Sequence, residues 1–426
     1  MRIALTDRNS LRIIMPIMGI LLCLRAIHNV FLYPLIALSF AIFAFCPLTI
    51  CLPILFFLLP SANIIKVSPG QISIFTVFYA ITVFRIIFKN SQMEKKLVAC
   101  VVLFVMYSIL FSGVSQIVTI VTMAFGFILL HDTSVSDGYD YSTILTSYAL
   151  GIILASTLGV FKSQLPIIER FVSSEMMKIG HKEYMERFSG LHGNPNYYTL
   201  DLTVVLSCLV VSMCMKKITI WNTILFLCLT VFGLMSISKS FLVACAFLVA
   251  MLLFFSLRNG LKSFIGVLLV LVVAGISVYY FAEDSINGYI MRLLQDSESN
   301  SDISSMTTGR WDIWETYFNA IFEDPKLLLL GKGIGGSLVD NKGAHNTYVE
   351  FIYFLGIVGT TIYLCVLKSV INLPHKRRNV LLYVPIVAIL IRFLAIGVLI
   401  YDNVWYYYAL ICLMWSDDDK RRINVA

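Results

Sequence analysis

The sequence contains few charged residues, and this shortage decides the class of protein. Only 13% of its 426 residues are Asp, Glu, Lys or Arg, while 59% are hydrophobic. Soluble domains carry about 25% charged residues. Apolar runs of roughly 20 residues recur along the chain, and in lipid each backbone polar group must be satisfied within its own helix. The composition excludes a soluble domain and predicts an all-α, polytopic helical membrane protein.

The sequence also lacks the usual groupings of metal ligands and phosphate-binding residues. All ten cysteines lie in apolar stretches, which supports neither a disulfide framework nor a spaced zinc site. No Asp-x-Asp pair lies in a predicted external loop, where it could hold a metal on a nucleotide sugar. The glycine run at 331–336 lacks the Gly-Lys-Ser/Thr ending of a phosphate loop, so we expect it only to turn the chain. We therefore expect no metal and no cofactor, and we take the net charge of +7 as topological rather than as a sign of nucleic-acid binding.

The apolar segments predict 12–14 transmembrane helices, because the pairs at 30–60 and 379–416 can each be read as two helices or as one bent element. Clusters of Lys and Arg mark the inner loops and place both termini in the cytoplasm. The prediction has five parts: N-terminal helices at 1–161, an external loop at 162–197, central helices at 198–281, a large external loop at 282–345 that carries the chemistry, and C-terminal helices with a cytoplasmic tail at 346–426.

Arg310 stands in the first turn of a helix predicted within the large loop. Trp311, Trp314, Phe318 and Phe322 recur there at helical spacing as one apolar face, and Thr308 can cap the helix. The helix dipole disfavours a cation in the first turn by up to about 1 kcal/mol, but an anion bound between the arginine and the free N–H groups reverses this. The other interpretation is a salt bridge to a neighbouring acid, and both stay open.

Arg187 precedes a tight turn, Asn194-Pro195-Asn196, that leads directly into an apolar span. The turn places this arginine at the mouth of the helices, where a second arginine on the same face would allow two-sided recognition of phosphate. The alternative is an arginine that extends to lipid headgroups. His192 lies in the turn as well, and we expect it to face water rather than to act as an acid–base group.

His345 begins another span on the predicted external side. Its imidazole can accept a proton near neutral pH, as a general base acting on a hydroxyl must, although it could instead cap the helix or face headgroups. Asn346 could orient the ring or bond an acceptor. Lys239, in a short turn between two apolar spans, either adds positive charge to an anion site or extends to the membrane surface.

Together these stretches resemble the O-antigen ligase and O-antigen polymerase superfamily of bacterial envelope-glycan enzymes. The resemblance covers about residues 185–360, and the N-terminal half is similar only in being a helical array. Lys239 departs from the pattern, since relatives often have arginine there and lysine lacks the bidentate fork. The matching pieces are Arg187 with Ser189-Gly190 and Asn194-Pro195-Asn196, Ser236-x-Ser238-Lys239, Gly309-Arg310-x-x-x-Trp314, Gly331-x-Gly333, and His345-Asn346 followed by Leu355-Gly356.

The resemblance implies a GT-C-like inverting glycosyltransferase in the bacterial cytoplasmic (inner) membrane, with its site on the external or periplasmic face. Its donor would be an oligosaccharide on undecaprenyl pyrophosphate, with membrane lipids and a chain-length regulator protein as further partners. Arg187 and Arg310 would hold the pyrophosphate, and His345 would act as base on the acceptor hydroxyl. Further substrate contacts would come from Asn194, Asn196, Lys239, Trp314 and Asn346.

Three functions compete at this point. We favour a polysaccharide polymerase, which joins O-antigen or capsular repeat units. A ligase that moves the lipid-linked glycan to lipid A core shares the same motifs, and the sequence does not separate the two. A flippase or other transporter ranks lower, because it would be expected to carry charged residues in mid-membrane and inverted repeats, whereas the spans here are nearly free of charge.

Overall fold

The computed structural model describes residues 2–89, 95–136, 138–179, 183–215, 219–281, 286–291, 310–336, 338–339, 343–371, 379–399, 401 and 403–423. Two compact units alternate along the chain. The first unit comprises Met1–Arg85, Gly138–Tyr289 and Asn379–Ala388. The second comprises Ile86–Asp137, Ile290–Arg378 and Ile389–Ala426.

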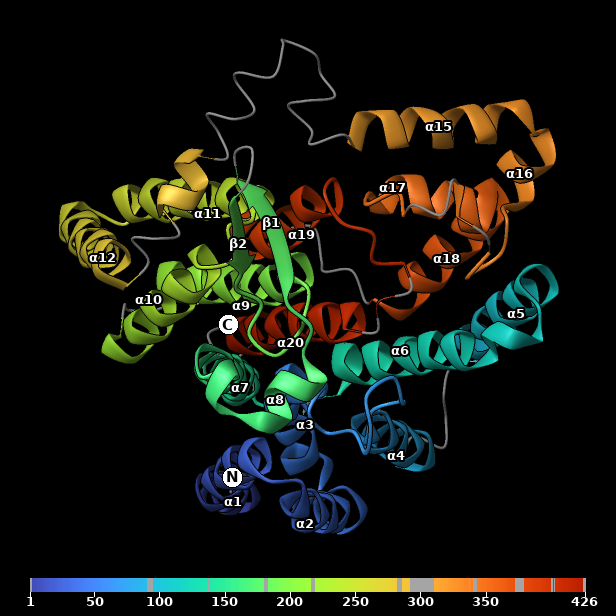
Figure 1. Cartoon of the computed structure of the whole chain (residues 1–426). Helices are drawn as coiled ribbons and strands as arrows, with labels where there is room; N and C mark the ends of the chain where they lie inside the picture. Colours follow the sequence, from blue (N-terminus) through green and yellow to red (C-terminus); the bar gives the residue numbers. More distant parts are fainter. Residues whose placement is uncertain are drawn as a thin grey trace. The chain divides into compact units, whose positions relative to one another are not determined.

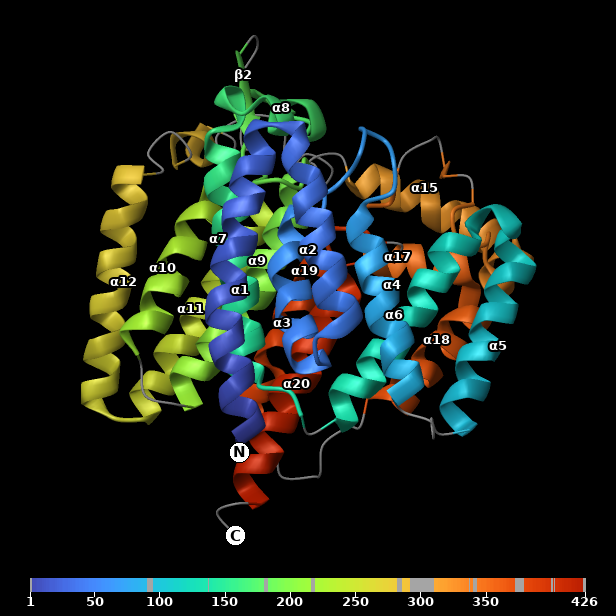
Figure 2. The ribbon, with the colours of Figure 1, turned by 90° about the horizontal axis from the view of Figure 1, so that it is seen from below.

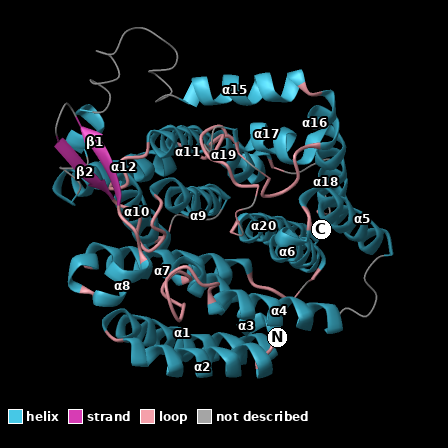
Figure 3. Cartoon of the chain, turned by 45° about the vertical axis from the view of Figure 1, so that its right-hand side comes forward, coloured by secondary structure: helices cyan, strands magenta, loops and turns pink. Residues whose placement is uncertain are grey.

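Helices make up almost all of the regular structure (Figure 3). Seven of the described helices are long and apolar enough to cross a membrane: Asp7–Ile27, Lys95–Ser112, Ile117–Val135, Tyr141–Val160, Pro195–Met215, Lys239–Arg258 and Thr347–Val370. Shorter apolar helices are Asn29–Phe45, Leu48–Ser61, Ile220–Leu234, Leu261–Ser277 and Val380–Phe393. The prediction of an all-α, polytopic membrane protein is confirmed.

The first unit is built around α9 (Pro195–Met215), which is buried along nearly its whole length and packs against α7, α10 and α11. The pair predicted at 30–60 consists of two helices that break at Cys46-Pro47. In Figure 2 the N-terminus and the strands lie at opposite ends of this unit's helices. The remaining helices are α1 (Arg2–Ile27), α2 (Leu32–Phe45), α3 (Leu48–Leu58), α7 (Tyr141–Val160), α8 (Pro166–Phe171), α10 (Ile220–Leu234), α11 (Lys239–Arg258) and α12 (Leu261–Phe281).

One β-hairpin interrupts the helices in the loop before α9. Strand β1 (Glu175–Ile179) pairs antiparallel with β2 (Glu183–Arg187), and this register sets Glu175 directly opposite Arg187. The sequence analysis did not predict these strands. They contain several Glu, Lys and Met residues and few β-branched ones, so the pattern typical of strands is weak.

The second unit has an aromatic core. Phe127 contacts Phe104, Tyr363 and Trp405 at ring-centroid distances of 5.4, 5.6 and 4.8 Å. Its helices are α5 (Lys95–Ser112), α6 (Ile117–Val135), α15 (Arg310–Glu323), α16 (Pro325–Leu330), α17 (Thr347–Glu350), a π-helix at Phe351–Leu355, α18 (Gly356–Val370) and α20 (Val404–Ile423). In Figure 1, α15 to α18 are drawn in orange. α4 (Ile74–Lys89) and α19 (Val384–Phe393) extend across the boundaries between the units.

Two predictions about helix ends are resolved in the second unit. The apolar run at 379–416 is not one bent helix, because α19 ends at Phe393 and α20 begins at Val404. α15 begins at Arg310, which confirms that this arginine lies in the first turn of a helix. The proposed cap, Thr308, lies outside the described residues.

The predicted apolar face of α15 is largely exposed. Trp311, Phe318 and Phe322 are 44%, 41% and 70% exposed, whereas Tyr317 and Ile321, which flank this face, are buried. Exposed aromatic side chains in a row suit a helix that lies on a membrane surface.

Candidate functional site

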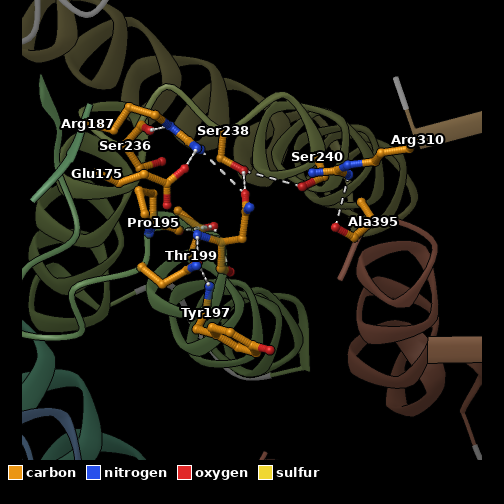
Figure 4. A network of polar contacts seen from close by, with 12 residues as sticks. Glu175, Arg187, Pro195, Tyr197, Thr199, Ser236, Ser238, Ser240, Arg310 and Ala395 are labelled. Atoms are coloured by element: carbon orange, nitrogen blue, oxygen red, sulfur yellow. Dashed lines mark hydrogen bonds and ion pairs between the residues drawn. The ribbon is translucent and has the colours of Figure 1, made fainter. Parts of the chain in front are cut away.

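Arg187 lies at the centre of a buried polar network in the first unit (Figure 4). Its side chain is only 6% exposed, and the guanidinium donates through all three nitrogens. Nη1 contacts the Glu175 carboxylate at 2.6 Å, Nε contacts the Ser236 carbonyl at 3.2 Å, and Nη2 contacts Oδ1 of Asn196 at 3.4 Å. Arg187 is therefore a buried group with a hydrogen bond from each of its nitrogens, and the alternative of an arginine that extends to lipid headgroups is wrong.

Burial lowers the pKa of the Arg187 guanidinium from its ordinary value, and the charge of Glu175 opposes this shift. The group still stays charged, because an arginine side chain is not deprotonated in proteins. Glu175 thus neutralises Arg187 across the hairpin and occupies the position that an anionic ligand would take.

The Asn194-Pro195-Asn196 turn connects this network to the start of α9. Oδ1 of Asn194 accepts from the backbone N–H groups of Asn196 and Tyr197 at 2.9 and 3.3 Å, so Asn194 caps the helix. The side-chain oxygen of Asn196 accepts from both Arg187 and Ser238. Three residues predicted from the sequence, Arg187, Asn194 and Asn196, therefore meet in one place.

The turn between α10 and α11 completes the network. Ile237 has a φ of 49°, a strained value for a β-branched residue, and its side chain is fully buried. Tyr289 donates through its hydroxyl to the Ser238 carbonyl at 3.3 Å. Lys239 is the first residue of α11 and is half-buried beside this network.

His192 does not face water, so the expectation of a solvated turn histidine is wrong. Its side chain is 11% exposed and its Nε2 lies 2.6 Å from Oδ2 of Asp201, which is fully buried on α9. Asn63 also fixes the turn, since its side-chain nitrogen donates to the carbonyls of Leu191 and His192. A single sequence did not indicate this pairing because Asp201 reads as a polar residue inside an apolar run.

Arg310 in the second unit is anchored to the segment that follows α19. Its Nη1 donates to the Ala395 carbonyl at 3.0 Å (Figure 4). The hydroxyl of Thr347 donates to the next carbonyl, that of Ile396, at 2.6 Å. Two motifs that are far apart in sequence therefore end on adjacent peptide groups.

His345 lies between these anchors. Its φ is 49°, in the left-handed region that costs a non-glycine residue free energy, and its side chain is exposed. Trp314, one helical turn after Arg310, donates from Nε1 to the carbonyl of Ala344 at 2.8 Å. One face of α15 thus holds both the arginine and the residue that precedes the histidine.

Asn346 caps the span that follows. Its Oδ1 accepts from the backbone N–H groups of Tyr348 and Val349 at 3.0 and 3.3 Å. Capping by a side-chain oxygen satisfies donors that would otherwise be unpaired at the start of a helix. Contact between Asn346 and a substrate stays a prediction.

Glu350, which the sequence analysis did not single out, holds the same segment from the other side. Its carboxylate accepts a hydrogen bond from the backbone N–H of Leu399. It also lies directly against Gly397, where an added Cβ would fall 1.7 Å from Oε1. Arg310, Thr347 and Glu350 therefore all attach to residues 395–399, which read as part of an ordinary apolar span in the sequence.

The glycine run at 331–336 does more than turn the chain. Lys332 and Gly333 donate from their backbone N–H groups to the carbonyls of Tyr353 and Phe354 at 2.8 and 2.9 Å. A Cβ on Gly356 would lie 2.5 Å from the backbone nitrogen of Gly331. The two glycine motifs of the second unit thus pack backbone to backbone, an approach that only glycine permits.

Among the described residues, no three His, Cys, Asp or Glu side chains are grouped so as to hold a metal ion. The polar side chains in the two networks are arginines, the Glu175 and Glu350 carboxylates, carboxamides, hydroxyls, an indole and a histidine. Such groups can bind an anion and transfer a proton.

A comparison with known protein families finds one similarity. Residues 224–364 match the family described as O-Antigen ligase, which confirms the resemblance to the O-antigen ligase and polymerase superfamily over this segment. The matched segment contains Lys239, Arg310, Trp314, His345 and Asn346, whereas Arg187 and the Asn-Pro-Asn turn precede it. The comparison with curated proteins gave no match.

Proposed function

We propose that the protein is a polysaccharide polymerase that joins O-antigen or capsular repeat units carried on undecaprenyl pyrophosphate. In this proposal the site faces the external side of the bacterial cytoplasmic membrane and needs no metal ion. Membrane lipids surround the helices, and a chain-length regulator protein is a further partner.

One observation supports this proposal most strongly. Arg310 and the span that begins at His345 are tied to adjacent carbonyls, those of Ala395 and Ile396, through Arg310 itself and Thr347. Transfer of a sugar from a pyrophosphate donor to a hydroxyl requires an anion-binding group and a proton-accepting group held close together. Attachment to the same segment can hold Arg310 and His345 in this way.

The proposed reaction assigns a role to each group. The acceptor hydroxyl gives its proton to the His345 imidazole while its oxygen attacks the anomeric carbon of the donor sugar. The bond between that carbon and the pyrophosphate oxygen breaks with inversion, and undecaprenyl pyrophosphate leaves. Arg187 and Arg310 stabilise the negative charge that develops on the leaving group.

The role proposed for Arg187 depends on one further step. The pyrophosphate must replace the Glu175 carboxylate on the guanidinium, and Glu175 lies on a partly exposed strand from which its side chain can withdraw. Asn194, Asn196, Lys239, Trp314 and Asn346 are proposed to contact the substrate or to support these groups.

The test is reconstitution with purified protein and lipid-linked repeat units, without lipid A core and with excess chelator. A ladder of lengthening lipid-linked glycans is expected. Product formed only when lipid A core is supplied would establish the ligase alternative instead. Activity lost in chelator and restored by a divalent ion would overturn the metal-free mechanism.

A further inference from the structure

A cavity of about 530 Å³ lies beside Arg187 within the first unit. Its walls come from four places: the end of α7 with the turn after it, the segment from α8 to β1, the end of β2 with the following turn, and Met235 at the end of α10. This volume falls within the range of about 300–1,000 Å³ found for small-molecule sites. The cavity is larger than a phosphate group requires.

The lining combines hydrogen-bonding groups of both kinds with apolar side chains. Glu169 and Glu186 supply carboxylates, Ser163 and Ser173 supply hydroxyls, and Phe188 and Val172 supply apolar surface. Sugar rings present hydroxyls at their edges and C–H groups on their faces, so a mixed lining of this kind suits them. A fatty acyl chain would instead need an apolar cavity.

A chain of polar contacts closes one side of the cavity. Lys162 donates from Nζ to the Ser174 hydroxyl and lies 3.5 Å from the Glu186 carboxylate, and Ser174 also contacts Glu186. Arg187 follows Glu186 directly on β2 and lines the cavity too. The lining therefore holds the buried Arg187 directly after the exposed Glu186 on one strand.

This charge arrangement separates two parts of a ligand. Glu169 and Glu186 offset Lys162 and Arg187, so the lining as a whole carries no net charge, and a pyrophosphate reaches the Arg187 guanidinium only where it replaces Glu175. A neutral, hydroxyl-rich group attached to that pyrophosphate can then occupy the cavity.

We propose that this cavity binds the sugar residue next to the pyrophosphate of the lipid-linked donor. The proposal rests on the proposed function, since it takes the Arg187 ligand to be a pyrophosphate. It assigns Glu186 and Ser174 as sugar-binding residues, which neither the sequence motifs nor the family match contains.

The test uses protection of a single introduced cysteine. Ser163→Cys places a thiol in the lining, and Gln164→Cys places one at the next, exposed residue of the same turn, outside the lining. Each variant is purified in lipid nanodiscs and treated with a water-soluble maleimide. The labelling rate is measured alone, with lipid-linked repeat units, and with undecaprenyl pyrophosphate, and the unsubstituted protein gives the background from the native cysteines.

The proposal predicts that lipid-linked repeat units slow the labelling of Ser163→Cys at least fivefold, while undecaprenyl pyrophosphate does not. The rate for Gln164→Cys should stay unchanged in both cases. Equal protection by undecaprenyl pyrophosphate would show that the cavity holds the lipid headgroup and would overturn the proposal. Unchanged labelling of Ser163→Cys with both ligands would overturn it as well.

A second measurement separates this proposal from the proposed function. Arg187→Ala is assayed for glycan formation next to the labelling experiment. Wild-type glycan from Arg187→Ala together with protection at Ser163→Cys would refute the arginine's role and leave the sugar site standing. Loss of glycan in Arg187→Ala without protection would refute the sugar site alone.

Discussion

Replacement of Gly397 by alanine tests the support beneath Arg310. The added Cβ would lie 1.7 Å from Oε1 of Glu350, far inside van der Waals contact, so the carboxylate or the backbone must move. Gly397 is absent from the glycines with positive φ, so the penalty is steric rather than conformational. The displaced group is the one that accepts the Leu399 N–H bond.

The magnitude follows from two contributions. Overpacking costs about 1–3 kcal/mol and loss of a hydrogen bond about 0.5–1.5 kcal/mol, which together make roughly 1.5–4.5 kcal/mol. We expect Gly397→Ala to lower the free energy of unfolding by roughly this amount, which corresponds to a fall in Tm of roughly 3–18 °C at about 2–4 °C per kcal/mol. Glycan formation should fall about 100-fold if the Arg310 guanidinium moves by about 1 Å.

Thermal unfolding of purified protein in detergent and a glycan ladder assay measure the two effects. Gly266→Ala is the matched control, because a Cβ there meets nothing within 4 Å and alanine stabilises a helix by up to about 1 kcal/mol relative to glycine. In a Glu350→Ala background the space is free, so Gly397→Ala should cost less than about 1 kcal/mol. An equal loss of stability in both backgrounds would refute the steric explanation.

Three further predictions follow from other contacts. Arg310→Lys keeps the charge but not the planar fork, so its glycan formation should fall nearly as far as that of Arg310→Ala at matched membrane levels; near-wild-type activity in the lysine variant would argue against phosphate recognition by a fork. His192→Ala removes the imidazole that lies against the buried Asp201 carboxylate and should destabilise the protein by about 3–5 kcal/mol in thermal unfolding. The control His28→Ala removes only an exposed cap on the Val30 N–H and should cost about 0.5–2 kcal/mol; equal Tm values for the two variants would contradict the buried pair. Two introduced cysteines test the orientation: Met176→Cys, where the native side chain is 55% exposed, and Ser299→Cys. A membrane-impermeant thiol reagent should label both in intact cells. Labelling of either one only after permeabilisation would refute the predicted orientation.

Much of the fold was predictable because membrane spans follow directly from composition. Long apolar runs indicate helices without any tertiary information, and an arginine followed by regularly spaced aromatics predicted the start of α15. The apolar run at 379–416 did not show where its helices end. Residues 394–399 are as apolar as a membrane span, yet they are not helical. Their backbone conformation follows from contacts with Arg310, Thr347 and Glu350, which no local pattern contains.

The sequence predicted several polar residues of the candidate site but not the residues to which they bond. Arg187, Asn194 and Asn196 were recognised as a group near one turn, and the structure joins them through hydrogen bonds. Glu175 was not foreseen, because its pairing with Arg187 depends on the register of an unpredicted hairpin. His192 was misjudged for a related reason, since its partner Asp201 lies two turns into a buried helix.

The most direct test of the proposed mechanism is His345→Ala, measured for both donor binding and transfer. A base acts on the acceptor proton and not on the pyrophosphate, so this variant should bind lipid-linked repeat units with an unchanged Kd. It should form no glycan longer than one repeat unit. Wild-type glycan formation by His345→Ala, at a membrane level equal to that of the unsubstituted protein, would contradict the account.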